Sequence, residues 1–105
     1  MAKRTTDTKH QLSGDWTIAG VVSQVDSLSH SLDNMTSARK KSLHVDCGQI
    51  EAIDMSGLQL IHIWLQCAKI RGLQTHLVNL PDDMQLAIQR LGLQQCFADT
   101  YPDVA

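Results

Sequence analysis

Residues 43–72 constrain the fold more than any other stretch, because two hydrophobic periods meet within them. Apolar and polar residues alternate first, which predicts a strand over residues 42–47. After a short turn-rich link, apolar residues recur with a helical period from about Met55 to Arg71. A strand that leads into a helix through a small polar loop presents the first backbone N–H groups of that helix outward. The sequence therefore predicts that a charge or a partner acts at this junction.

The predicted helix has two distinct faces. Its core face is expected to hold Gly57, Leu60, Ile61, Trp64, Cys67 and Ala68. The opposite stripe is polar and contains Gln59, His62, Gln66 and Lys69. Ile63 and Ile70 fall on this polar side, beside two of its glutamines. These isoleucines either form a contact surface or are covered by a loop or the C-terminal tail.

The remaining pattern alternates strands with helices. A strand is predicted over residues 9–13, ended by Gly14, and another over residues 74–80. Pro81 and two aspartates predict the start of a helix that Gly92 ends. Its buried stripe is expected to be Met84, Ala87, Ile88 and Leu91.

The first helix is expected to begin after Thr17 as its N-cap. Its apolar stripe is predicted to be Ile18, Val21, Val22, Val25, Leu28 and Leu32. Residues 33–41, rich in turn formers and charge, predict a mobile loop. The order strand, helix, strand, helix, strand, helix indicates an α/β fold with at least part of its sheet parallel.

Composition and charge exclude several classes. With 105 residues the chain is expected to form one domain over residues 9–97, between a loose segment 1–8 and a tail 98–105. Its net charge is −2 with dispersed basic residues, which argues against nucleic-acid binding. Three cysteines without paired spacing predict neither a disulfide framework nor a zinc site. No apolar run is long enough for a membrane span, so we expect a cytoplasmic protein without membrane insertion.

The sequence offers no catalytic constellation. Its five histidines fall on five different predicted elements without ligand spacing, and no glycine-rich phosphate loop appears. Ser56 is the one residue for which the sequence suggests two different roles. It either satisfies an N–H group at the helix start, with Asp54 as the N-cap, or serves as a phosphoacceptor whose added charge changes the surface a partner meets. Capping alone accounts for a serine at this position.

Three motifs together resemble the STAS domain, the family of sulfate-transporter cytoplasmic domains and bacterial anti-sigma-factor antagonists. They are Val45-Asp46, Ile53-Asp54-Met55-Ser56-Gly57-Leu58 and Leu91-Gly92-Leu93. The resemblance runs from about Leu12 to Phe97. It implies a small mixed sheet of about four strands with helices packed mainly on one side, and a non-enzymatic switch module without cofactor or metal.

The resemblance also implies a protein partner. This would be a GHKL-type serine kinase/anti-sigma factor or a sensory or chemotaxis component. The implied partner-binding residues are Asp54, Met55, Ser56, Gly57, Gln59, Ile63 and Gln66. The alternative is a cytoplasmic STAS subunit of a membrane transport system, such as a lipid-transport ABC complex. The exposed isoleucines leave open whether the chain forms a homodimer.

One position departs from the family pattern. The usual phosphoacceptor directly follows the aspartate, and here Met55 stands there. Methionine cannot accept phosphate, and Ser56 matches the next residue of the motif, which is not normally the acceptor. An apolar Met55 exposed at the loop favours constitutive docking instead. A third candidate function is an anion or nucleotide sensor at the helix N-terminus.

Overall fold

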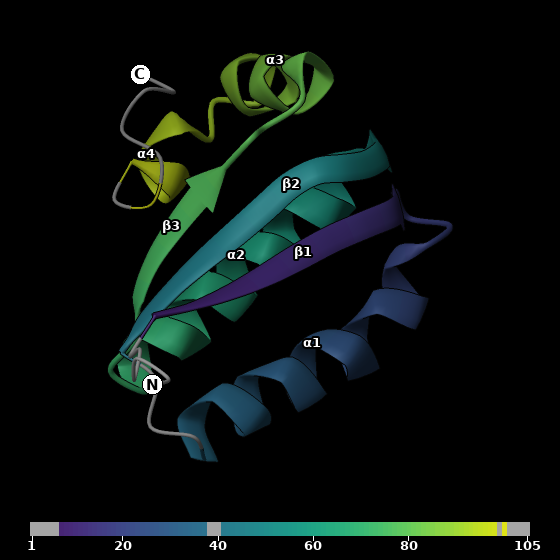
Figure 1. The fold of residues 1–105 in the computed structure, drawn as a ribbon. Coiled ribbons are helices and arrows are strands. Elements are labelled where there is room, and N and C mark those ends of the chain that lie inside the picture. The colour runs from purple at the N-terminus through teal and green to yellow at the C-terminus, as the bar shows by residue number, and fades with distance from the viewer. Residues whose placement is uncertain (1–6, 38–40, 99, 101–105) are drawn as a thin grey trace.

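The protein alternates strands and helices from end to end, as a computed structural model shows (Figure 1). This structure describes residues 7–37, 41–98 and 100. The elements are β1 (Asp7–Trp16), α1 (Val21–Ser37), β2 (Ser42–Ile53), α2 (Met55–Ile70), β3 (Gln74–Val78), α3 (Asp82–Arg90) and α4 (Gln94–Phe97). The predicted α/β class and element order are confirmed, with α4 as an additional short helix.

The sheet has three strands in the order β1-β2-β3, and both pairings among the described residues are parallel. The expectation of about four strands in a mixed sheet was therefore wrong in these two details. Each connection between neighbouring strands runs through a helix, and such a crossover returns the chain in the same direction. The helices α1 and α2 contact each other and lie on one face of the sheet (Figure 1).

The core lies between this face and the two helices. Leu43, Val45 and Cys47 of β2 point into it, since alternate side chains of a strand share one face. Both tryptophans are buried, and their ring N–H groups donate to backbone oxygens. Trp16 Nε1 donates to Ser13 O at 2.9 Å, and Trp64 Nε1 donates to Leu28 O at 3.0 Å. Neither ring is left with an unsatisfied polar group.

The first helix differs from its prediction at both ends. Asp15 Oδ1 accepts hydrogen bonds from the amide and the hydroxyl of Thr17, so Thr17 belongs to a turn and α1 begins only at Val21. At the other end α1 continues to Ser37, where a loop was expected from residue 33. Met35 is buried against the core. Its packing outweighs the weak helix propensity of the polar residues around it. Residues 38–40 of the predicted loop lie outside the described part of the chain.

The strands β1 and β2 are also longer than predicted. β2 continues through the expected link to Ile53, because its second half pairs with the second half of β1, where Gly14 lies opposite Ile50 and Trp16 opposite Ile53. Gly14 does not end β1. It adopts φ +85° where the register shifts, as at a β-bulge. Asp7 and Thr8, expected in the loose N-terminal segment, belong to β1.

The third strand is short. β3 pairs only with Ser42–Asp46 of β2 and ends at Val78. Asn79 follows in a left-handed conformation (φ 57°), and Pro81 caps α3. A left-handed residue and a proline both prevent the ladder from continuing. Within the described ranges, the second half of β2 therefore has no strand partner on this side, and α3 lies beside it instead.

Candidate functional site

The junction between β2 and α2 is held by the carboxylate of Asp54. Its Oδ1 accepts hydrogen bonds from the backbone N–H groups of Ser56 (2.8 Å) and Gly57 (3.3 Å). This confirms Asp54 as the N-cap of α2. Its Oδ2 accepts a third bond from the N–H of Ile18 at 2.9 Å. One side chain thus ties the start of α2 to the turn that follows β1.

Gly57 lets the first turn of α2 lie directly against β1. A Cβ atom at this position would stand 1.9 Å from the carbonyl oxygen of Trp16. Gly57 is buried, so its part in the predicted surface is to permit this close approach.

Ser56 is half-buried, and its hydroxyl makes no hydrogen bond within the described part of the chain. Its own N–H is already satisfied by Asp54, so the carboxylate rather than the serine hydroxyl performs the capping. An anion bound at this helix start would have to displace that carboxylate from the two N–H groups. The geometry therefore gives no support to the anion or nucleotide sensor.

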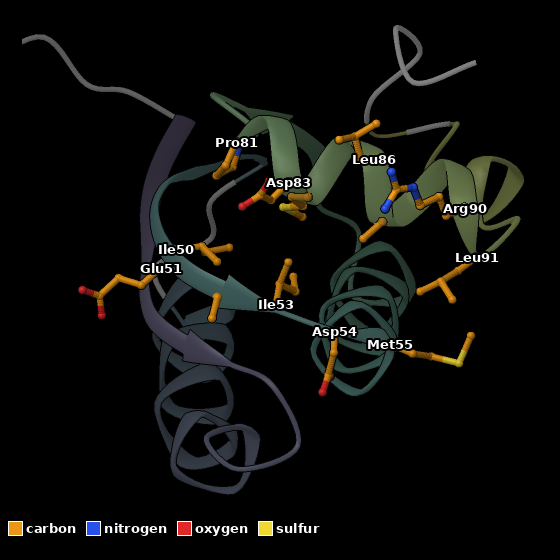
Figure 2. Close-up of a pocket in the computed structure, with 13 residues that line it drawn as sticks. Ile50, Glu51, Ile53, Asp54, Met55, Pro81, Asp83, Leu86, Arg90 and Leu91 are labelled. Atoms are coloured by element: carbon orange, nitrogen blue, oxygen red, sulfur yellow. The ribbon is translucent and has the colours of Figure 1, made fainter.

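Met55, at the start of α2, leads into an exposed stripe. Figure 2 shows the side chains of Asp54 and Met55 at this end of the helix. The stripe continues along α2 at steps of three and four residues, as positions on one helix face do. We call it the α2 stripe, and its members are Met55, Gln59, Ile63, Gln66 and Ile70.

Three of the five residues in the α2 stripe are large and apolar. Met55 is 39% exposed, Ile63 58% and Ile70 84%. The exposure of the two isoleucines excludes the alternative that a described loop covers them. The predicted residues Asp54, Met55, Ser56, Gln59, Ile63 and Gln66 thus lie on one side of α2 or at its start. An apolar stripe of this kind on a helix that is otherwise packed is typical of a protein contact surface.

Sequence reasoning missed a second exposed apolar patch, in the first turns of α1 and the turn that precedes it. Ile18 and Val22 are 72% and 80% exposed, and Val25 is also exposed, although all three belong to the predicted apolar stripe. The predicted apolar arc of α1 is wider than the core can cover, and only its Leu28 side is buried. The width of that arc was the one feature of the sequence that could have indicated exposed apolar residues here.

A groove between α1 and α2 joins this patch to the α2 stripe. Val25 of α1 lines it together with Leu60, Ile63 and Cys67 of α2. Leu60 is half-buried and packs against the core, as predicted, whereas Cys67 is exposed and its assignment to the core face was wrong. At one end of the groove, Arg71 Nη1 lies 2.8 Å from Asp33 Oδ1.

Other potentially reactive side chains lie away from this site. His44 and His76 stack on neighbouring strands with ring centroids 4.9 Å apart, a pairing the sequence did not indicate. Among the described residues, no group of three or more His, Cys, Asp or Glu side chains is placed to hold a metal ion. Burial raises the pKa of the Cys47 thiol to about 12, and the charge of Asp46 adds to this. The thiol of Cys47 is therefore protonated at neutral pH.

The helices carry no membrane span: none that the structure describes is both long and apolar enough to cross a bilayer. Comparison with curated proteins gave no match. Comparison with protein-family models gave one that is described as "Mlab, STAS domain" and covers residues 2–99. That match spans nearly the whole chain, including the Asp54–Gly57 junction. The chain belongs to the STAS domain family.

Proposed function

We propose that this STAS domain is a non-enzymatic, cytoplasmic protein-binding module of the anti-sigma-factor-antagonist type. Its partner docks on the 54–57 turn and the α2 stripe. The observation that carries the proposal is the exposure of Met55, Ile63 and Ile70 on a helix whose opposite side is buried. Full burial of an exposed side chain of this size contributes about 1.5–3 kcal/mol, so Ile70 can gain most of that amount and the partly buried Met55 and Ile63 a part of it. Together they can dominate an interface.

Docking is proposed to be constitutive rather than switched by phosphate. Met55 stands at the usual acceptor position and offers an apolar, adaptable contact. The N–H groups that could stabilise a phosphate on Ser56 are already bonded to Asp54. A phosphate there would stand beside a carboxylate, and like charges repel. Ser56 remains the candidate phosphoacceptor, but only for a kinase that acts on the chain while the docking partner is not bound.

The proposed partner is a GHKL-type serine kinase/anti-sigma factor or a sensory protein. The test is affinity capture from cells of the source organism, followed by calorimetry with the purified partner. Met55→Asp and Gln66→Lys should each weaken binding at least tenfold, because each places a charge in the contact. Gln89→Lys, on the outward side of α3, is the matched control and should bind as the wild type does. Equal affinity for all four proteins would refute the proposal.

A second candidate function has one specific observation in its favour. The matching family model is described as "Mlab, STAS domain", so the chain matches a named STAS subfamily. We propose as this second function the alternative that the resemblance implied, a STAS subunit of a lipid-transport ABC complex. The same docking surface would then bind an ATPase subunit. Capture of an ATPase by the wild type but not by Met55→Asp would favour this function. Capture of a kinase or a receptor-array protein with the same dependence would favour the first.

A further inference from the structure

The second half of β2 offers an unpaired strand edge. β1 pairs with β2 as far as Ile53, whereas β3 pairs with it only as far as Asp46. Among the described residues, no backbone hydrogen bond joins Gln49–Ile53 to any element other than β1. The N–H and C=O groups that point away from β1 in this segment are therefore open to another strand.

A groove of about 560 Å³ runs along this edge, between β2 and α3 (Figure 2). Four consecutive β2 residues, 50–53, line it. Successive side chains of a strand point to opposite faces, so a cavity that touches four in a row lies against the backbone edge. On the other wall, Asp83, Ala87 and Arg90 lie one helical turn apart on α3. The small Ala87 leaves the middle of the groove open.

We propose that this groove binds an extended segment of a protein partner, which adds to β2 as a further strand. A strand edge that lies beside a helix is a recurring way to hold a peptide, because main-chain hydrogen bonds give affinity and the helix side chains select the residues. The four residues of β2 span about 13 Å, which matches a ligand of about four to six residues. The exposed side chains of Met55, Leu86 and Leu91 provide apolar contacts for alternate side chains of the ligand.

The charges of α3 define the chemistry of the ligand. Asp83 lies in the first turn of α3 and Arg90 in the last, and neither forms an ion pair within the described residues. Between them α3 lines the groove with Leu86 and Ala87, which are apolar. The opposite wall adds two carboxylates, those of Glu51 and Asp54, and the Asp54 carboxylate is already bonded to three backbone N–H groups. The complementary segment therefore has an apolar middle, a basic residue at the Asp83 end and an acidic residue or a C-terminal carboxylate at the Arg90 end. Main-chain hydrogen bonds alone would leave strand direction poorly defined, and the two charges fix it.

This inference goes beyond the proposed function, because it concerns the β2 edge and α3. The groove and the α2 stripe share Met55, but no other residue of the stripe lines the groove, so the two proposals can fail separately. Gln66 lies on the α2 stripe and does not line the groove. Gln66→Lys should therefore leave binding in the groove unchanged even though it weakens docking on α2.

The experiment is selection of a phage-displayed library of random heptapeptides on the folded wild-type protein. The most enriched heptapeptide is then synthesised as the probe. We expect its binding to shift the amide resonances of Ile50, Glu51, Ala52 and Ile53 in ¹⁵N-correlated spectra. Asp83→Lys and Arg90→Glu should each raise the Kd of the probe at least fivefold. Gln89→Lys, on the outward side of the same helix, should not change it.

A chemically modified probe tests the main-chain pairing directly. N-methylation removes the N–H donor of one peptide residue. N-methylation of the peptide residues whose N–H groups face β2 should raise the Kd more than tenfold. N-methylation of the intervening residues, whose N–H groups face away, should change it little, as strand addition requires. If N-methylation changed the Kd at neither set of positions, the proposal would be overturned. Failure to enrich any peptide, or amide shifts confined to the α2 stripe, would also overturn it.

The other possible occupant is a second copy of this chain. Sedimentation equilibrium distinguishes the two. A monomer at the concentrations used for the peptide measurements supports the proposal. A dimer that Asp83→Lys dissociates would show that the groove binds the protein itself, and would overturn it.

Discussion

Replacing Gly57 by alanine should destabilise the protein, although alanine is the better helix former. The added Cβ would lie 1.9 Å from the carbonyl oxygen of Trp16 and 2.8 Å from its carbonyl carbon. An ordinary C···O contact is about 3.3 Å, so α2 and Trp16 must separate by more than about 1 Å. Both clashing atoms belong to backbone, so no side-chain rotation can relieve the overlap.

Three terms set the size of the effect. Overpacking costs about 1–3 kcal/mol. Separation also stretches the bond from the Ile18 N–H to the Asp54 carboxylate, and such a charged bond contributes about 1.5–3 kcal/mol. The gain in helix propensity is about 1 kcal/mol. The free energy of unfolding should therefore fall by about 3 kcal/mol.

Urea denaturation followed by circular dichroism measures this change. With an m-value of about 2 kcal/mol/M, the midpoint should fall by about 1.5 M. Ser56→Ala is the matched control, because it alters the same helical turn without meeting Trp16. It should change stability by less than about 0.5 kcal/mol. If Gly57→Ala were as stable as the wild type, the close approach of α2 to β1 would not be required.

Three further outcomes follow from the structure. Asp54→Ala removes the acceptor of three backbone N–H groups and should lower the free energy of unfolding by about 2–5 kcal/mol in the same urea assay, since both the cap and the charged bond from Ile18 are lost; an unchanged midpoint would contradict its role as the cap. Val22→Ser should alter stability by less than about 0.5 kcal/mol, whereas Leu28→Ala should cost about 2–5 kcal/mol, and similar values for both would refute their assignment to opposite sides of α1. Cys47 should resist thiol reagents in the native state while the other two cysteines react. Because its pKa is raised from 9.0 to about 12, the unfolded chain loses the proton first, and stability should fall as pH rises above about 9; a slope unchanged in Cys47→Ala would contradict this.

The sequence predicted α2 well because its signals are local. Asp54 supplies a cap, the helical period sets the buried face, and Gly72 ends the helix in a left-handed conformation (φ 91°). The period also placed Ile63 and Ile70 on the outer side, where the structure has them. Each of these features depends on residues less than five positions apart or on one repeating period.

The failures depend on contacts between distant segments. Residues 48–53 contain glycine, glutamine and glutamate, and nothing within them predicts a strand. They form one because β1 lies alongside. The extra length of α1 similarly depends on the burial of Met35. The site was only partly predictable for the same reason. The α2 stripe could be predicted from a helical wheel, but the exposed apolar patch near the start of α1 could not, because it depends on how α1 and α2 pack.

The parallel sheet has a consequence for the route by which the chain folds. The described strands form no hairpin, so each of their pairings must wait until a complete helical crossover has brought the two strands together. Closing such long loops is slow relative to helix formation. Early in folding β2 therefore has two bare edges rather than one, and its apolar side chains are open to other chains. Its second half carries polar and charged side chains, such as Gln49 and Glu51, which are exposed. These side chains would discourage pairing with another copy of the chain before the sheet is complete.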